Sequence, residues 1–387
     1  MPVRALVRPQ VLSWGRTTAG LSVEEAAQLL SVKTEQLSQW ENGEQRPTMG
    51  QVRKMAVKYR RPLNVFFLQT APEDTGEPLL PDFRLGGQGV LSNHSRYLRF
   101  ALRTAREWRL DAFDLFQTIE ASPLRFELQV SLTDGADEAA EKIRKWLGVS
   151  LEIQLGWPGY DRFRALREWR DRIEGRGVLV FQFGRIEIPE MRGSSLYFDE
   201  LPVIVLNSSD APNGRIFTLM HELTHLALRG SGLCDVRYIQ PGAQAHSEIE
   251  VFCNAVAGAL LVPSSALLAL PDVVAGNHNT EWSDIRIAEL ANRFKVSRLV
   301  VLRRLLSLGK TNEAAYNSRH LIWSAASDAD GEGGGDGRRI ALNARGQLLT
   351  KLILAAHGAR KITLFDTARR LGIKADSIEY AREFIRA

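Results

Sequence analysis

The sequence has few cysteines and no long apolar run. Only two cysteines, Cys234 and Cys253, occur in 387 residues, which excludes a disulfide-stapled extracellular scaffold. Apolar stretches such as Ala255–Pro263 fall well short of the roughly 20 residues that a membrane-spanning helix needs. No apolar segment follows Arg4 and Arg8, which argues against a secretory signal. We therefore expect a cytoplasmic protein with no membrane partner.

Neither charge sign dominates the composition. The chain is 44% hydrophobic and 25% charged, an ordinary globular composition that excludes overall disorder. Its length predicts two or three domains at roughly 150 residues each. The net charge is +5, and the first 70 residues carry ten Lys and Arg against five acids, an excess equal to that of the whole chain. This balance permits nucleic-acid binding without demonstrating it.

Turn-rich stretches divide the chain into segments of different periodicity. Ala71–Pro81 is rich in proline and glycine, and Ser327–Arg338 is a Gly/Asp-rich low-complexity connector. Helical spacing surrounds one short region of β-type runs, which predicts a mainly α fold with a small β-sheet, an α+β protein. We expect helices at about 93–116, 138–147, 160–174 and in pieces from 216 to 308, and strands at 178–181, 195–198 and 203–206.

Residues Leu21–Phe67 carry the pattern of a helix-turn-helix. Ser22 and Glu25 predict a capping box that opens one helix, and Thr34 is expected to cap the next helix, which Asn42-Gly43 ends. A helix in the major groove reads bases with outward residues near its N-terminus. The predicted DNA contacts are Lys33, Thr34, Gln36 and Gln39.

The charge of this segment leaves its partner open. Between Leu21 and Thr48 there are two basic and five acidic residues, whereas DNA binding draws affinity from neutralised phosphates. Flanking basic residues at Arg4, Arg8, Arg16 and 53–61 could supply those contacts, or the module could bind protein instead. Similar helix–turn–helix spacing recurs at 288–302 and 368–384, although such pairs are a common way to pack helices.

The sharpest motif is His221-Glu222-Leu223-Thr224-His225. On a helix, positions i and i+4 share a face, so both imidazoles can hold one metal ion, with Glu222 placed to act on a water. The neighbouring residues are largely apolar, which predicts a buried helix, and buried histidines without a partner are costly. Two satisfied core histidines are the simpler alternative.

A catalytic zinc site needs a third protein ligand. Glu250 begins a second apolar helix, and its helix phase favours it over Glu248 and His246, which precede the buried part. Asn254 shares the Glu250 face and could hydrogen-bond a ligand. Cys253 is slightly off that face and is more simply a small buried hydrophobe. We predict one zinc ion per chain, with manganese as the alternative.

The expected chemistry follows from the ion. Zinc lowers the pKa of bound water toward ~7, and Glu222 would take up the proton and return it to the leaving amine. The donor for the developing oxyanion stays open among Tyr238, Arg237 and His246. The run Leu201–Leu206 is either an edge for an extended peptide or an ordinary core strand.

These motifs together resemble a bacterial and phage group, the XRE-type helix-turn-helix regulators fused to an ImmA/IrrE-type metallopeptidase domain. The first likeness rests on Leu21-Ser22, Gln39-Trp40-Glu41-Asn42-Gly43 and Pro47-Thr48. The second rests on residues 207–212 and 215–225, Glu250, Asn254, Ala257 and 260–263. The resemblance implies that His221, His225 and Glu250 are metal ligands and that Glu222 is the catalytic glutamate. Thr224, Phe252 and Val256 depart from common residues of the family but remove no ligand.

The implied organisation has five parts. These are an XRE-type helix-turn-helix domain (1–70), a linker with connecting helices (71–134), a zincin-like metallopeptidase domain (135–310), a flexible linker (311–338) and a small helical appendage (339–387). In the family such peptidases cut helix-turn-helix repressors. The expected function is thus a DNA-binding transcriptional regulator carrying a zinc-dependent endopeptidase, with operator DNA and a repressor-type protein as partners.

The sequence leaves three points about function and assembly open. One alternative is a non-proteolytic transcriptional regulator or antitoxin with a structural or sensory zinc domain. Another is that the helix-turn-helix only docks a repressor. A homodimer is also considered, because such readers often bind DNA as dimers.

Overall fold

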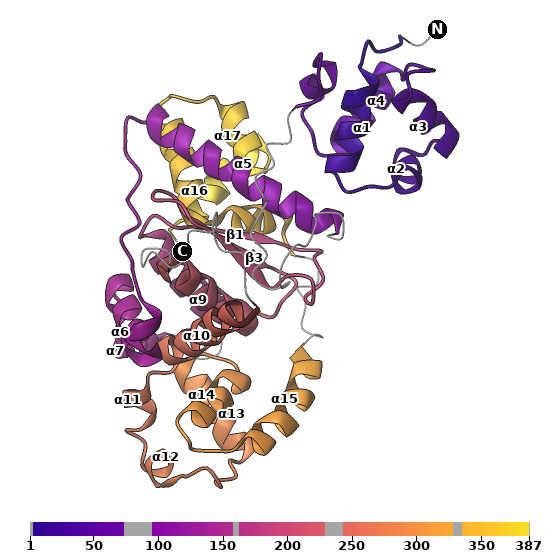
Figure 1. Ribbon diagram of the computed structural model, residues 1–387. Helices are drawn as coiled ribbons and strands as arrows, with labels where there is room; N and C mark the ends of the chain where they lie inside the picture. Colours follow the sequence, from indigo (N-terminus) through magenta and orange to yellow (C-terminus); the bar gives the residue numbers. More distant parts are fainter. Residues whose placement is uncertain (1–2, 73–94, 158–161, 229–242, 328–334, 387) are drawn as a thin grey trace. The chain divides into compact units, whose positions relative to one another are not determined.

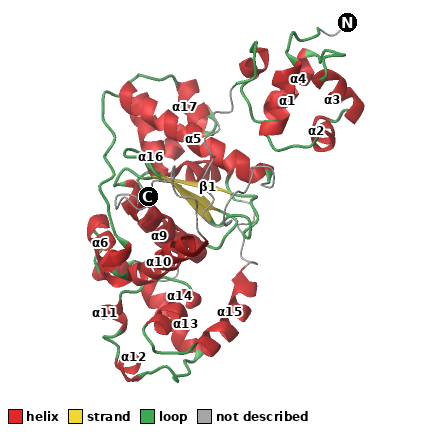
Figure 2. Ribbon diagram, viewed as in Figure 1, coloured by secondary structure: helices red, strands yellow, loops and turns green. Residues whose placement is uncertain are grey.

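The computed structural model describes residues 3–72, 95–157, 162–228, 243–327 and 335–386 (Figure 1). Within them the chain forms two compact units, one from residues 3–72 and 95–104 and one from residue 105 onward. Helices predominate around one three-stranded sheet (Figure 2), which confirms the predicted α+β fold. In the part of the chain that is described, no helix is both long and apolar enough to cross a membrane.

The first unit is a helix-turn-helix with the predicted start signals. Ser22 accepts from the Glu25 N–H while the Glu25 carboxylate accepts from the Ser22 N–H, which confirms the capping box. Thr34, however, is the first residue of its helix; Lys33 holds the cap position and makes no side-chain cap bond. The elements are α1 (Pro9–Thr18), α2 (Val23–Leu30), α3 (Thr34–Glu41), α4 (Met49–Lys58) and η1 (Leu63–Phe67).

The two later segments with similar spacing, 288–302 and 368–384, also form helix pairs. α13 (Asp284–Phe294) leads into α14 (Arg298–Ser307), and α17 (Leu364–Leu371) leads through η5 (Ala375–Ser377) into α18 (Ile378–Phe384). Each first helix ends on a left-handed residue, as α2 does: Ser31 at φ 55°, Lys295 at φ 60° and Gly372 at φ 69°. A left-handed residue after a helix turns the chain sharply and satisfies its last carbonyls.

The sheet has the order β1-β3-β2. β1 (Leu179–Phe183) runs parallel to β3 (Val203–Asn207), and β2 (Gly193–Leu196) runs antiparallel to it. β3 is therefore the central strand, and all five of its residues are buried. The interpretation of 201–206 as a peptide-binding edge is wrong, because both sides of β3 are already paired; among the described strands, β2 is an edge.

Both faces of the sheet are covered, as expected for strands with continuous apolar runs. Val180, Ile204 and Leu206 belong to the main core, together with apolar residues of the helix that carries the His221–His225 motif. On the other face, Phe181 and Phe183 each lie 5.2 Å from the ring of Trp108, in the second-unit part of α5 (Arg96–Thr118). The sheet thus lies between two helical layers (Figure 1).

The helices around the metal motif are longer than predicted. α9 (Pro212–Leu228) carries the motif, and α10 (Ala243–Leu261) begins well before Glu250. Glu248 and His246 therefore lie inside α10, and the expected helix start at Glu250 is wrong; Glu248 is nevertheless exposed and precedes the buried part of the helix, as expected. The remaining elements are η3 (Leu132–Asp134), α6 (Ala136–Leu147), α7 (Leu151–Gly156), α8 (Arg162–Glu174), α11 (Ser264–Leu267), α12 (Pro271–Ala275) and α15 (Glu313–Ser327).

The C-terminal segment packs into the second unit. α16 (Gly337–Gly358) lies against α8 and β1. It breaks at Gly346, whose φ of 76° and ψ of 176° are not helical. The Glu174 carboxylate caps the second half, accepting from the N–H groups of Gln347 at 2.9 Å and Leu348 at 3.4 Å. The segment expected as an appendage thus takes its geometry from a buried acid of α8.

Candidate metal centre

The helix that carries the histidines is fixed to the sheet at its start. At the end of β3, the Asn207 side chain donates to the backbone oxygens of Ile186 at 3.0 Å and Met191 at 2.8 Å. Buried Arg215, in the first turns of α9, donates to Gln182 Oε1 of β1 at 2.6 Å. These bonds satisfy polar groups that would be costly to bury alone, and they set the position of α9 against the strands.

Three side chains from α9 and α10 converge. Their ligand atoms all lie within 4.8 Å of one another. Nε2 of His221 is 3.0 Å from Nε2 of His225, and the Glu250 carboxylate lies 3.3 Å from the first and 3.1 Å from the second. The structure thus brings together the two motif histidines and the favoured third residue.

The donor set fits a divalent ion such as zinc. Asn254 Oδ1 lies 3.1 Å from His221 Nδ1; with this oxygen as acceptor, Nδ1 carries the proton and Nε2 presents a lone pair to the cluster. Glu250 Oε1 is buried, and among the described residues no group donates to it apart from the nearby ring nitrogen of His225, 3.1 Å away. Electron lone pairs that converge in a poorly solvated site repel one another unless a cation lies between them. Two imidazoles with a carboxylate are a known zinc ligand set.

The electrostatics of Glu250 agree with this arrangement. Burial alone would raise the pKa of its carboxyl, but the two adjacent imidazoles lower that pKa well below its usual range. The group is therefore an anion at neutral pH, as a metal ligand must be.

Glu222 is buried beside this cluster and points toward the sheet. Its residue exposure is 4%, and its Oε2 accepts a hydrogen bond from Ser195 Oγ of β2 at 3.0 Å. The sequence motif identifies Glu222 but offers no signal for Ser195. The serine arrives from a strand whose register is set by long-range pairing with β3.

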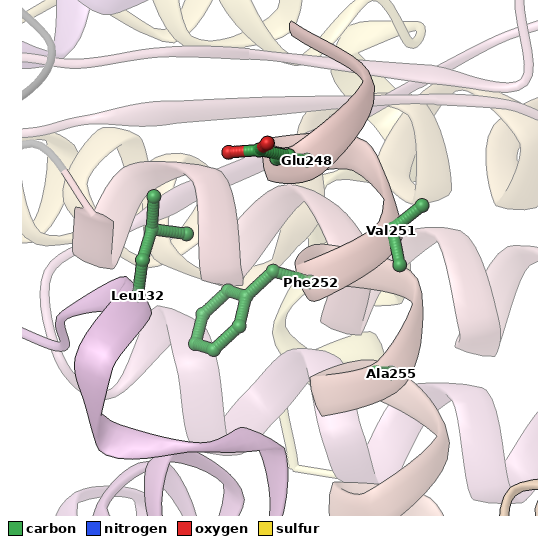
Figure 3. Close-up of a pocket in the computed structure, with 5 residues that line it drawn as sticks. All are labelled: Leu132, Glu248, Val251, Phe252 and Ala255. Atoms are coloured by element: carbon green, nitrogen blue, oxygen red, sulfur yellow. The ribbon is translucent and has the colours of Figure 1, made fainter. Parts of the chain in front are cut away.

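The rival Glu248 does not join the site. Glu248 is exposed and, with Leu132, Val251, Phe252 and Ala255, lines a groove of about 420 Å³ beside α10. Figure 3 shows Glu248 and Phe252 projecting from α10 on the side of Leu132.

Several other candidates from the sequence lie outside the described residues. The side chain of His246 lies outside the described residues, as do Tyr238, Arg237 and Cys234. Cys253 is buried, in keeping with its interpretation as a small hydrophobe.

The predicted DNA contacts lie on α3 and at the cap position before it. Lys33 is exposed, and Thr34, Gln36 and Gln39 are partly exposed. Of the flanking basic residues, Arg16 is not available, because its guanidinium is bound to the Glu41 carboxylate at 2.9 Å with both side chains largely buried.

Comparison with known proteins agrees with this geometry. Residues 12–66 match the helix-turn-helix family model, and residues 174–306 match the IrrE N-terminal-like domain, a peptidase family. The chain joins a helix-turn-helix domain to an IrrE-like peptidase domain. The second match spans β1, β2, β3, α9 and α10, so all three converging residues, Glu222 and Ser195 fall inside it.

Two curated relatives carry the same printed name, radiation response metalloprotease IrrE. The protein of Deinococcus deserti is 30% identical over 154 residues, covering 38% of this chain and 50% of that protein. The protein of Deinococcus radiodurans is 32% identical over 97 residues, covering 24% of this chain and 28% of that protein. The chain thus spans half or less of the relatives it matches, and the likeness supports a metallopeptidase domain.

Proposed function

We propose that this chain is a DNA-binding transcriptional regulator whose second unit is a zinc-dependent endopeptidase that cleaves a repressor-type protein. The observation that carries the proposal is the convergence of His221, His225 and Glu250 next to a buried glutamate. The metalloprotease relatives support the activity. The helix-turn-helix in the first unit of the same chain supports a regulatory substrate rather than a digestive one.

The residues divide the chemistry between them. His221, His225 and Glu250 would hold the ion, which, when bound, polarises the scissile carbonyl and activates water. Glu222 accepts the proton of the attacking water and returns it to the amide nitrogen as the C–N bond breaks. Asn254 keeps the His221 ring in one tautomer and orientation.

Strand β2 supplies a place for an extended substrate. Arg192 pairs with Asn207 by a backbone hydrogen bond. The alternation of an antiparallel ladder then turns the N–H and C=O groups of Gly193 and Ser195 away from β3. Among the described residues, no strand pairs with β2 on that side. A peptide in extended form could add to this edge next to Glu222.

The proposal is tested by Glu222→Gln, which keeps the size of the side chain and removes its basicity. Wild type and variant are loaded with zinc, incubated with lysate of a host cell, and new protein N-termini are identified by mass spectrometry. We expect new N-termini in DNA-binding regulatory proteins with wild type only, at equal zinc content. Identical sets of N-termini from both proteins would favour the non-proteolytic regulator or antitoxin.

A further inference from the structure

We infer that Ser195 is a positioning residue that holds the carboxylate of Glu222 in its working orientation. The inference rests on the proposed peptidase function and assigns a role within the same site. Its basis is the hydrogen bond from Ser195 Oγ to Glu222 Oε2 at 3.0 Å. An ionised carboxylate can only accept, so the hydroxyl is the donor, and a bond to a charged acceptor is stronger than one between neutral groups.

The serine is held by the sheet rather than by a loop. Ser195 is opposite Ile204 in the β2–β3 register, so its backbone position follows from β3. Two residues earlier, on the same face of the strand, Gly193 lies so close to α9 that an added Cβ would be 2.3 Å from Thr218 Cγ2 and 3.3 Å from Glu222 Cγ. β2 and α9 are therefore in close contact at the level of Glu222, and Ser195 bridges them.

The consequence is a fixed orientation of the Glu222 carboxylate. The hydrogen bond from the hydroxyl to Oε2 restricts rotation of a side chain with three rotatable bonds and so sets the direction in which the carboxylate meets the attacking water. The backbone of Ser195 faces the edge proposed for the peptide. One residue would thus set the position of the base relative to the substrate strand, and a misplacement of about 1 Å can cost a hundredfold in rate.

The experiment uses the zinc-loaded full chain and acetohydroxamic acid as the probe. A hydroxamate chelates an accessible metal and binds more tightly where an adjacent carboxylate accepts its proton, so the difference in affinity between variants of equal zinc content reports the placement of Glu222 without a known substrate. We expect Ser195→Ala to weaken binding about tenfold, the effect of losing one hydrogen bond to a charged group. Zinc content should not change. Ser195→Thr, which restores the hydroxyl, should bind like wild type, and Ser194→Ala, on the opposite face of β2, is the matched control.

The outcomes separate this role from the peptidase function itself. If Glu222→Gln weakens hydroxamate binding but Ser195→Ala does not, the positioning role is overturned and the peptidase site stands. A Thr variant as weak as the Ala variant also overturns it, because the hydroxyl would not be responsible. If zinc-loaded wild type does not bind the probe, the proposed function fails, and this inference with it. Ser195→Cys, a poor donor of similar size, gives the same test if the Ala variant does not fold.

Discussion

Asn254 Oδ1 contacts His221 Nδ1 at 3.1 Å, while Nε2 of the same ring lies 3.3 Å from Glu250 Oε2. Asn254 and Glu250 are one turn apart on α10, so a single helix face supplies both a proposed ligand and the group that would orient the proposed ligand His221. If these roles are right, the metal affinity depends on a residue that does not touch the metal.

Asn254→Ala is therefore expected to lower zinc affinity by roughly 10–100-fold, the usual effect of removing such a partner. Asn254→Asp keeps an acceptor for the Nδ1 proton and should retain most of the affinity. Competition with a chelator of known affinity measures both variants. Equal affinities for wild type and the Ala variant would mean that the contact does not orient the ring.

Glu250→Ala should cost more than this, because it removes a ligand rather than its partner, and zinc should be lost on dialysis. Glu248→Ala is the matched control: it is the same change two residues earlier in α10, where the side chain lines the groove instead of the site. Metal content by mass spectrometry compares the variants with wild type. Zinc retained in Glu250→Ala would show that another residue is the third ligand.

Local spacing was enough to predict the parts of the site that lie on single helices. The i, i+4 relationship of His221 and His225 and the shared face of Glu250 and Asn254 are properties of one helix each, so the sequence displays them. Ser195 meets Glu222 only because β2 pairs with β3 and α9 crosses both. No local pattern encodes that register.

The same distinction between local and long-range contacts applies to the fold. Capping residues such as Ser22 and Thr48 locate helix starts because their bonds span only a few residues. The central position of β3 and the docking of α16 depend on contacts between distant segments. Glu174 caps a half-helix 173 residues further along the chain, and an amphipathic pattern does not reveal such a partner.

Glu174 should make stability depend on pH. Burial raises its pKa to about 7 from the ordinary glutamate value of 4.5, so between these values the folded protein binds a proton that the unfolded chain releases. The contribution of Glu174 to the free energy of unfolding is therefore fully present below pH 4.5 and is lost as the pH rises through 7. The loss is up to about 3 kcal/mol at 1.36 kcal/mol per pKa unit.

Glu174→Gln isolates this effect, because the variant shares every other titrating group. The free energies of unfolding of both proteins are measured in urea from pH 5 to 8, and the variant is expected to gain relative to wild type as the pH rises. Its pH-independent loss of one capping acceptor shifts the curve without changing its slope. Parallel curves would mean that Glu174 titrates normally.

Gly193→Ala should destabilise the second unit and disturb the site together. The new methyl group would meet Thr218 Cγ2 at 2.3 Å and the Val205 carbonyl oxygen at 3.1 Å, and overpacking typically costs about 1–3 kcal/mol. Gly258→Ala in α10 is the control, since nothing lies within 4 Å of its added Cβ, and it should gain up to about 1 kcal/mol. Thermal unfolding and hydroxamate affinity are read for both. A Gly193→Ala protein with wild-type stability would contradict the close β2–α9 contact.

DNA binding by the first unit should depend on Lys33. It is exposed at the start of α3, and a lysine that neutralises one phosphate contributes about 0.9 to the slope of log affinity against log salt. Lys33→Ala is therefore expected to weaken binding of the full chain to its operator and to flatten that slope by about this amount.

Lys295→Ala is the control, because Lys295 lies at the turn of the α13–α14 pair and should leave the slope unchanged. If Lys295→Ala flattens the slope and Lys33→Ala does not, the DNA binds at the α13–α14 pair instead. A slope unaffected by either change would favour the helix-turn-helix as a docking surface for protein, which its acidic residues between Leu21 and Thr48 also allow.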